Sequence, residues 1–262
     1  MSAIITSINN CPVKSISFQK LEMCKINKNI GIVGDRVFAF SQNLDLDQSK
    51  EFEKNPEARK GKWNKIVTLK NTPVFNKYNF SNEENKLTLT LKNKDIITIN
   101  INNSDEREDL VKKLIELESS LKNDIRLMRN EEYPFYDTSI SNKSIFNNSI
   151  SLININSVRD FENKIDRKIE MSTFRGNLYF DGMEAWEERN WIGKTLNINN
   201  VLFKVEKNIP RCVAINLKPK TDDNSFNLLK ILKQTYDHYD MGVYLTPEND
   251  GEINLSEKIH IK

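Results

Sequence analysis

The sequence predicts a mainly β, barrel-like fold with a few helices, in the α+β class. Short alternating or β-branched segments recur along most of the 262 residues, whereas apolar residues at helical spacing are confined to a few stretches. The length fits one or two domains, and 38% hydrophobic residues are enough for a substantial core. A barrel is favoured over an open sheet because closure removes exposed strand edges.

The composition argues against several classes of protein. A net charge of +2 with 29% charged residues is unlike a strongly basic nucleic-acid binder. The two histidines, His238 and His260, are too few for a multi-histidine metal site. Cys11, Cys24 and Cys212 form neither a disulfide framework nor a CxxC zinc signature. We find no signal peptide and no apolar run near the ~20 residues of a membrane span, so we expect a soluble, cytoplasmic protein.

In the first half of the chain, strands are expected at residues 4–8, 18–26, 31–40, 66–69 and 74–80. The clearest element is a hairpin, because residues 86–92 and 96–101 alternate around Asn93-Lys-Asp95. The polar residues 41–61 indicate a loop or a short helix. Ser104 can cap a helix whose apolar residues share one face; they are Leu110, Val111, Leu114, Leu117 and Leu121. Residues 126–144 are irregular, so we divide the chain into residues 1–125 and 126–262.

In the second half, strands are expected at residues 149–155, 174–180, 195–198, 201–205, 242–245 and 259–261. Ser157-Val-Arg-Asp160 has the spacing of a capping box, with Asp in place of the usual Glu or Gln. We therefore expect a helix to begin there. A second helix is expected over residues 225–233, behind the acidic pair Asp222-Asp223.

The most informative stretch is residues 208–218, where Cys212 follows Arg211 directly. A neighbouring arginine favours the thiolate, the form of cysteine that binds metals and attacks electrophiles. Pro210 biases its neighbour to an extended conformation, so the pair is expected at a strand end or turn. A cysteine is nevertheless more often a small buried hydrophobe. Local chemistry leaves both interpretations open.

Other candidate groups are equally ambiguous on their own. Lys14, Arg36, Arg175 and Arg211 lie near turn signals; each is typical of a surface charge, but together they could clamp a phosphate. The carboxylates around Trp186 are more typical of a solvated surface than of a metal or glycosidase site; they are Asp181, Glu184, Glu187 and Glu188. His238 lies among tyrosines, which favours a structural role over acid–base catalysis. Neither a Walker loop nor a GxGxxG motif is present.

Five short motifs in order resemble those of the MOSC domain family, whose members include reductases of N-hydroxylated compounds. Cys11-Pro-Val-Lys-Ser15 is similar to Tyr-Pro-Val-Lys-Ser, and Gly34-Asp-Arg36 to Gly-Asp-Arg. Phe174-Arg-Gly-Asn177 is similar to Phe-Arg-Pro-Asn. Pro210-Arg-Cys212 resembles the cysteine motif, and residues 237–244 resemble Gly-His-x-x-x-Gly-Val-Tyr.

The resemblance implies an N-terminal β-barrel-like domain, residues 1–125, packed on a MOSC β-barrel domain, residues 126–262. It implies a molybdenum cofactor (Mo-molybdopterin) between them, with Cys212 as the catalytic thiolate ligand of the metal. The residues that would hold the pterin and its phosphate are Lys14, Ser15, Arg36, Arg175, Asn177 and Arg211. The activity implied is reduction of N-hydroxylated or N-oxide substrates by oxygen transfer at molybdenum.

Electrons would come from a separate ferredoxin-, flavoprotein- or cytochrome-like donor, because the sequence shows no cysteine-rich C-terminal extension. Partners other than this donor and a small-molecule substrate, such as nucleic acid or a membrane, are not expected. The sequence departs from the family pattern at Gly176, at Cys11 and at residues 215–219, where Ile-Asn-Leu-Lys-Pro replaces Thr-Thr-Val-Asp-Pro. These departures leave the substrate range open. Two alternatives to a reductase also remain open: a carrier of the cofactor or of persulfide sulfur on Cys212, and a scaffold without cofactor.

Overall fold

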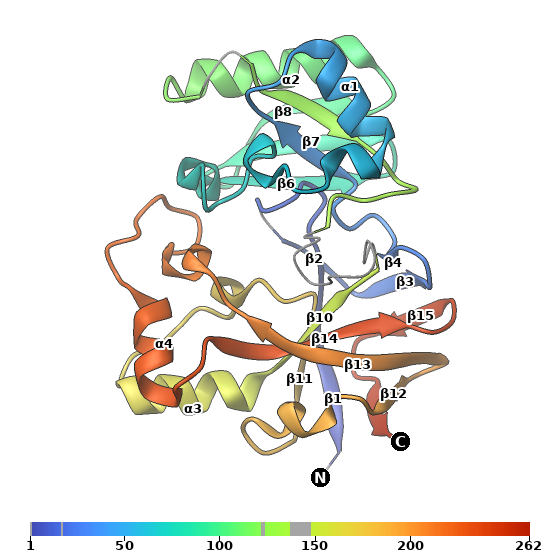
Figure 1. Ribbon diagram of the computed structural model, residues 1–262, viewed down its shortest axis with the longest axis vertical. Helices are drawn as coiled ribbons and strands as arrows, with labels where there is room; N and C mark the ends of the chain where they lie inside the picture. The colour runs from blue at the N-terminus through green and yellow to red at the C-terminus, as the bar shows by residue number, and fades with distance from the viewer. Residues whose placement is uncertain (1, 17, 122–123, 137–147) are drawn as a thin grey trace.

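The computed structural model describes residues 2–16, 18–121, 124–136 and 148–262. It shows two bodies stacked end to end, with both labelled chain ends at the far end of the lower body (Figure 1). The lower body holds a barrel flanked by two helices, and the upper body holds smaller sheets and two more helices. No helix in the described parts of the chain is long and apolar enough to cross a bilayer.

Seven strands close the barrel of the lower body. Around the barrel they are β1 (Ala3–Asn10), β11 (Leu178–Asp181), β10 (Ile150–Asn154), β14 (Asp240–Pro247), β13 (Val201–Pro210), β12 (Thr195–Ile198) and β16 (Lys258–Ile261), which returns to β1. Only the β10–β11 pair among them is parallel. Because β1 pairs with both β11 and β16, the first strand of the chain completes a barrel otherwise made by the second half.

The barrel has an apolar interior, in which Phe180 stacks on Trp191 with ring centroids 5.2 Å apart. Two helices pack outside it, α3 (Ile155–Ile165) and α4 (Leu228–Tyr236). One small sheet continues the same core, formed by β15 (Gly251–Asn254), β3 (Met23–Asn27) and β4 (Gly31–Ile32). The short β2 (Gln19–Leu21) pairs with the far end of β1 and leads toward the upper body.

The upper body contains two separate sheets. One pairs β5 (Phe38–Ser41) with β9 (Arg126–Arg129); the other contains β6 (Tyr78–Glu83), β7 (Lys86–Leu91) and β8 (Lys94–Asn100). The helices are α1 (Leu46–Lys54) and α2 (Ser104–Leu117). Within the described residues no strand pairing joins the two sheets, so the second barrel expected here is not formed by sheet closure. The fold is α+β with one seven-stranded barrel.

Several predicted elements are confirmed, and others differ because a loop or a 3₁₀ helix replaces the expected strand. The hairpin at β7–β8, both helices after Asn103 and Asn227, and β12 lie where the patterns indicate. Residues 66–69 form no strand, and residues 74–77 belong to a 3₁₀ helix, Pro73–Lys77, because proline suits a first helical position. β9 and β15 were not predicted; residues 137–144 of the segment expected to be irregular lie outside the described residues.

The predicted capping box at Ser157 is wrong. α3 already begins at Ile155, because the Asn154 side chain accepts from the backbone N–H of Asn156. Ser157 lies inside the helix, where its hydroxyl donates to the buried carboxylate of Glu188 at 2.8 Å. The division between residues 125 and 126 stays a prediction. The structure adds that β1, together with Cys24 and Ile26 of β3, packs in the barrel core.

Candidate functional site

Cys212 lies at the end of a long barrel strand. β13 ends at Pro210, and Cys212 is the extended residue (φ −119°, ψ 178°) that precedes the 3₁₀ helix Val213–Asn216. This confirms the prediction that the Arg-Cys pair follows a strand. Cys212 is exposed, in contrast to the buried Cys11 and Cys24. The chain therefore presents a single described thiol to solvent, next to the junction of the two bodies.

Arg211 is folded back beneath this thiol and ties three segments together. Its Nη1 donates to the carbonyl of Phe174 at 2.7 Å, and its Nε donates to the carbonyl of Met241 at 3.0 Å. Burial lowers the pKa of Arg211, and this outweighs the opposing influence of Tyr244, Tyr179 and Cys212. Arg211 thus fixes the end of β13 against β14 while holding positive charge beside Cys212.

Arg175 is a second half-buried cation next to the same thiol. It has a left-handed backbone (φ 53°) that ends the 3₁₀ helix Met171–Phe174 and turns the side chain toward the upper body. Its Nη1 donates to the carbonyl of Ile16 at 2.9 Å, and its guanidinium lies 5.1 Å from the centroid of the Phe18 ring. Burial lowers the pKa of Arg175, the charge of Arg36 lowers it further, and Cys212 acts in the opposite direction. Within the described residues Arg175 has no carboxylate partner.

Arg36 also lies near Phe18, with its guanidinium 5.9 Å from the ring centroid. It is paired with Asp35, a carboxylate only 1% exposed that also accepts from the backbone N–H of Cys11 at 2.6 Å. Burial has the largest single effect and lowers the pKa of Arg36, but the combined attraction of Asp35, Cys11, Tyr136 and Tyr244 outweighs it and the pKa is raised. The guanidinium also lies 5.3 Å from the Tyr136 ring centroid. Phe18 is therefore a shared platform for two arginines.

The remaining predicted site residues have different positions. Asn177 is buried within the barrel wall, where its Oδ1 accepts from the hydroxyl of Ser151 at 2.8 Å and its Nδ2 donates to the carbonyl of Asn9 at 3.3 Å. It thus joins β1 to β10 and β11. Lys14 is only 5% exposed, and Ser15 has a left-handed backbone (φ 65°). The structure brings Arg36, Arg175, Arg211 and Cys212 together, and it places Asn177 behind them.

A cavity of about 780 Å³ between the two bodies opens beside Arg175. Five of its lining side chains are cationic; they are Lys20, Lys77, Lys92, Arg175 and Lys220. Glu170 is the one carboxylate among the described residues that line it. Such an excess of lysine and arginine favours an anionic ligand, because ammonium and guanidinium groups both suit phosphate oxygens.

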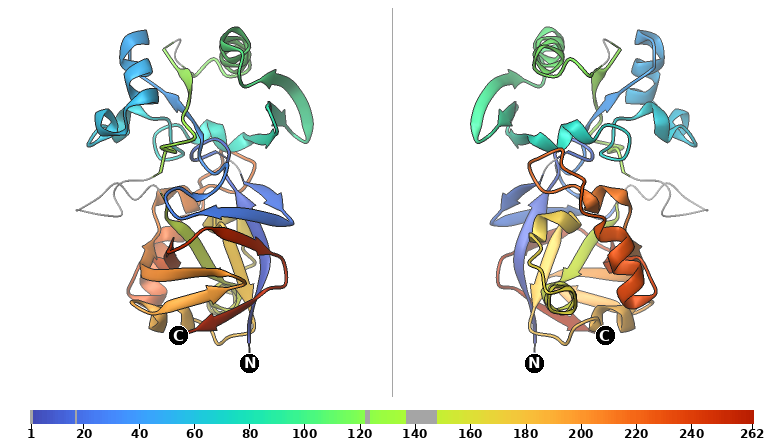
Figure 2. Two further views of the ribbon diagram at one scale, coloured as in Figure 1. Left: turned by 90° about the vertical axis from the view of Figure 1, so that its right-hand side faces the viewer. Right: turned by 90° about the vertical axis from the view of Figure 1, so that its left-hand side faces the viewer.

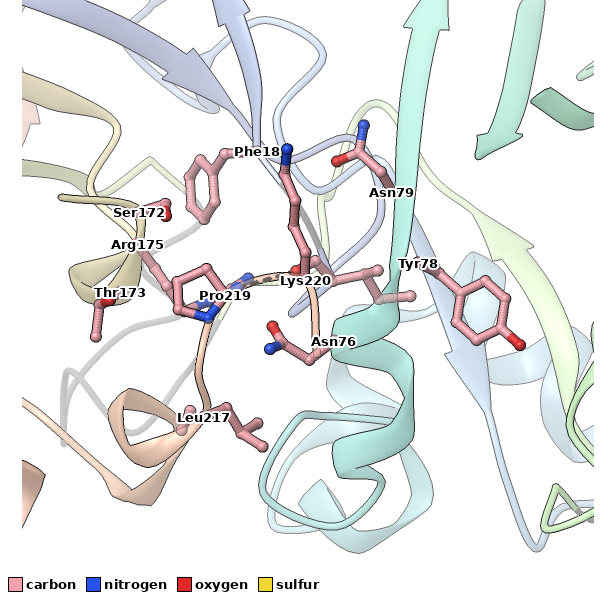
Figure 3. A pocket seen from close by; sticks show the side chains of 12 residues that line it. Phe18, Asn76, Tyr78, Asn79, Ser172, Thr173, Arg175, Leu217, Pro219 and Lys220 are labelled. Carbon is pink, nitrogen blue, oxygen red and sulfur yellow. Dashed lines mark hydrogen bonds between the residues drawn. The ribbon is translucent and has the colours of Figure 1, made fainter. Parts of the chain in front are cut away.

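A smaller cavity of about 100 Å³ shares Phe18 and Arg175 with the first one. Figure 3 shows Phe18 and Arg175 on one side of it, with Asn79 and Lys220 opposite. Ala214, two residues after Cys212, also lines it. Arg175 therefore connects the cationic cavity to the segment that carries the exposed thiol.

Sequence reasoning missed Phe18 and the cavity lysines. Phe18 stands only four residues after Lys14, but no pattern marks a stacking platform for two arginines. The lysines come from β2, the upper body and residue 220, and single lysines in a lysine-rich chain give no signal. Tyr244, whose charged form would attract both Arg36 and Arg211, does lie in the motif of residues 237–244.

The two competing candidates have structural roles. His238 accepts from the backbone N–H of Asp240 at 3.1 Å and stacks on Tyr236, and burial lowers its pKa. Glu188 is fully buried against α3. Across the described residues, no group of three or more His, Cys, Asp or Glu side chains is placed to hold a metal ion.

Comparison with known proteins adds a family match. Residues 138–260 match the MOSC domain. Mitochondrial amidoxime reducing component 2 of Rattus norvegicus is 36% identical over 72 residues, which cover 28% of this chain and 21% of that protein. The match thus spans about a fifth of that relative.

Two solved structures are also similar. The YuaD protein of Bacillus subtilis is 9% identical, with a TM-score of 0.45, over 100% of this chain and 96% of that chain. YiiM from Geobacillus stearothermophilus is 17% identical, with a TM-score of 0.35, over 43% of this chain and 53% of that chain.

Proposed function

We propose, from the match of residues 138–260 to the MOSC domain, that the protein is an oxidoreductase that uses a molybdenum cofactor to reduce N-hydroxylated or N-oxide substrates. The match to an amidoxime reducing component supports this class of reaction. The single observation that carries the proposal is the convergence of Arg175 and Arg211 on the exposed Cys212, beside a cationic cavity.

The residues present fit a phosphorylated pterin that carries a thiophilic metal. Arg175 is a half-buried cation whose hydrogen bonds within the described chain end at the carbonyl of Ile16, so part of its guanidinium is free to bind an anion. The cavity lysines add charge for a phosphate. Cys212 offers the soft sulfur that a metal of this type prefers. The donor set thus matches both ends of the cofactor.

In this proposal each residue has a separate task. Cys212 would hold the metal, and Arg36 and Arg175, which both lie near Phe18, would hold the anionic pterin and its phosphate. Arg211 positions Cys212 through its bonds to Phe174 and Met241. When bound, the cofactor supplies two-electron oxygen-transfer chemistry. Lys14 and Ser15 remain in the proposed set, and Asn177 supports the barrel wall behind Arg175.

We further propose that electrons arrive from a separate donor protein. Of the three cysteines, Cys11 and Cys24 are buried and Cys212 is assigned to the metal. Because Cys212 is exposed at the junction of the two bodies, a cofactor bound there would be accessible to an external donor protein. A small-molecule N-hydroxylated substrate would approach from the same exposed side.

Cofactor content is the direct test. Protein purified from a host that makes the cofactor is expected to contain about one molybdenum and one pterin, with the metal lost in Cys212→Ser. Arg175→Gln is expected to lower both contents about tenfold, because it removes a charged hydrogen bond worth ~1.5–3 kcal/mol. Arg159→Gln is the matched control, since the side chain of Arg159 is 52% exposed and pairs with Asp181 on the barrel surface.

Turnover separates the reductase from its alternatives. Reduction of a hydroxylamine with an artificial electron donor, abolished in Cys212→Ser, would support the enzyme. Exchangeable cofactor without turnover would indicate a carrier, and a mass increase of one sulfur on Cys212 would indicate a persulfide carrier. Folded wild-type protein with neither molybdenum nor pterin would overturn the proposal.

A further inference from the structure

A third cavity, a groove of about 320 Å³, lies in the upper body between α1 and α2. The two helices stand on either side of β9, which forms the floor between them (Figure 2). Figure 2 shows this arrangement at the end of the molecule farthest from both labelled chain ends. The groove shares no lining residue with the two cavities beside Arg175. It is therefore a separate candidate site.

The groove has an apolar base. Leu127 and Met128 of β9 are buried beneath it, and Val111 and Ile115 of α2 are only partly covered by the core. Leu46, at the start of α1, lies on the rim and is 45% exposed. When a ligand covers partly exposed aliphatic side chains of this kind and removes them from water, the burial makes the binding free energy more favourable.

Its polar side chains have an excess of positive charge. Four cations line the groove, Lys50, Arg107, Lys112 and Arg126, against two carboxylates, Glu53 and Glu108. Glu53 is already engaged, because its Oε1 accepts from Arg107 Nη1 and from the backbone N–H of Arg129, both at 2.9 Å. Within the described chain Arg126 has no ion pair.

Two of these cations also have unused hydrogen-bond donors. The Nε atoms of Arg107 and Arg126 are buried and have no acceptor among the described residues. A buried donor without a partner costs about 1–3 kcal/mol. A ligand that brings an anionic oxygen to this point would remove that penalty.

We propose that the groove between α1 and α2 binds a small amphipathic anion, a single-chain carboxylate of the fatty-acid type. Its head group binds Arg126 and Lys50, and its chain lies along Val111 and Ile115. The volume falls within the range of small-molecule sites, roughly 300–1,000 Å³. The charge selects an anion, and the aliphatic base selects a flexible alkyl chain.

The test is calorimetric titration of the full-length protein with decanoate. Binding of one decanoate per chain is expected, weakened about tenfold in Arg126→Gln, which removes a charged contact. Lys50→Gln and Lys54→Gln are a matched pair on α1, because Lys50 lines the groove and Lys54 is exposed outside it. Only the change at Lys50 is expected to weaken binding.

Further ligands identify the chemistry. Decylamine and acetate are expected not to bind, because one lacks the anion and the other lacks the chain. Decyl phosphate shares the chain of decanoate but carries a charge of about −1.5 to −2 at neutral pH. Tighter binding of decanoate would support the carboxylate head group, and tighter binding of decyl phosphate would overturn it. Absence of decanoate binding, equal binding of decylamine, or unchanged affinity in both Arg126→Gln and Lys50→Gln would each overturn the proposal. The outcome is independent of molybdenum content, so it does not depend on the function proposed at Cys212.

Discussion

The three cysteines differ sharply in their surroundings. Cys11 has no exposed surface and its thiol donates to the carbonyl of Val13 at 3.0 Å. Burial raises the pKa of Cys24 to about 12, and the nearby Asp35 and Glu257 act in the same direction. Cys212 is exposed. At the residue scale, position relative to the core separates a chemically available thiol from two packing residues.

This difference predicts selective alkylation. In native protein at neutral pH, iodoacetamide is expected to modify Cys212 alone, because a buried protonated thiol reacts slowly. Intact mass should show one adduct in the wild type and none in Cys212→Ser. In denaturant, all three thiols of the wild type should react. Rapid modification of Cys11 or Cys24 in the native protein would contradict the burial described here.

The sequence could identify most individual residues of the site, but not how deeply each one is buried or which of them meet. Cys212, Arg36, Arg175 and Arg211 were marked by short motifs, and the structure brings them together. Asn177 was marked as well, but a sequence cannot show that its amide is used by Ser151 and Asn9 inside the barrel wall. The cavity lysines were invisible for a simpler reason. Their convergence depends on how the two bodies meet.

At the scale of elements, Gly242 shows how closely β14 approaches β10. It has φ +80°, and a Cβ there would lie 2.4 Å from the carbonyl oxygen of Leu152. Gly193 has nearly the same backbone, φ +82°, but a Cβ there would meet nothing within 4 Å. The two glycines share the left-handed conformation and differ only in the space around them.

This pair gives a controlled stability prediction. Gly193→Ala should cost about 1–2 kcal/mol, the price of a left-handed L-residue. Gly242→Ala should cost a further ~1–3 kcal/mol, because the added methyl pushes β14 away from β10. Urea unfolding of both variants measures the difference. Equal destabilisation would mean that β14 shifts freely, against the close packing seen here.

Glu188 makes the stability of the α3 region depend on pH. Burial raises the pKa of this carboxyl, although Ser157 and Asn154 donate hydrogen bonds to it. A raised folded-state pKa means that the folded protein holds a proton that the unfolded chain has released. Stability from this group is therefore full below the ordinary carboxyl pKa and falls as pH rises through the raised value.

The prediction is a difference between variants. From about pH 4.5 upward, above the ordinary glutamate pKa, the unfolding free energy of the wild type should fall relative to that of Glu188→Gln, which cannot ionise. Glu184→Gln is the control, because Glu184 is exposed on the same loop. Denaturant unfolding at several pH values measures the slopes. Parallel curves for wild type and Glu188→Gln would contradict the raised pKa.

Elements were predictable where local pattern and tertiary packing agree. The β7–β8 hairpin and α2 have strong periodicity and were found. The strand expected at residues 66–69 does not form. These residues belong to a loop whose apolar side chains are buried, and its one β-bridge among the described residues joins Ser41 to Ile66. The helix cap predicted at Ser157 was wrong, because its hydroxyl donates instead to Glu188, a carboxylate distant in sequence.

At the scale of the whole molecule, the barrel is assembled from both ends of the chain. β1 contributes Ala3, Ile5 and Ile8 to the barrel core, which otherwise comes largely from residues after 148. Periodicity predicted the strand but could not predict its partners, because the residues of β11 and β16 that pair with it are at least 170 residues away in sequence. A division of the chain at residue 125 therefore separates a strand from its own barrel.

A fragment experiment tests this arrangement. Residues 126–262 expressed alone are expected to aggregate or remain unfolded, because the edges of β11 and β16 lose their partner. Co-expression with residues 1–125 should restore soluble protein as a complex. Circular dichroism and size-exclusion chromatography report the outcome. Cooperative unfolding of the isolated fragment would show that β1 is dispensable.

The same closure has a consequence during protein synthesis. β1 leaves the ribosome long before β16, which pairs with it through Ala3 and Ile4 and spans Lys258–Ile261. The barrel cannot close until β16 has been translated, so the apolar side of β1 lacks its barrel partners for most of the time in between. Contacts of such long sequence separation slow folding and prolong exposure to aggregation. We therefore expect the yield of native protein to depend on chaperones that bind the nascent N-terminal segment.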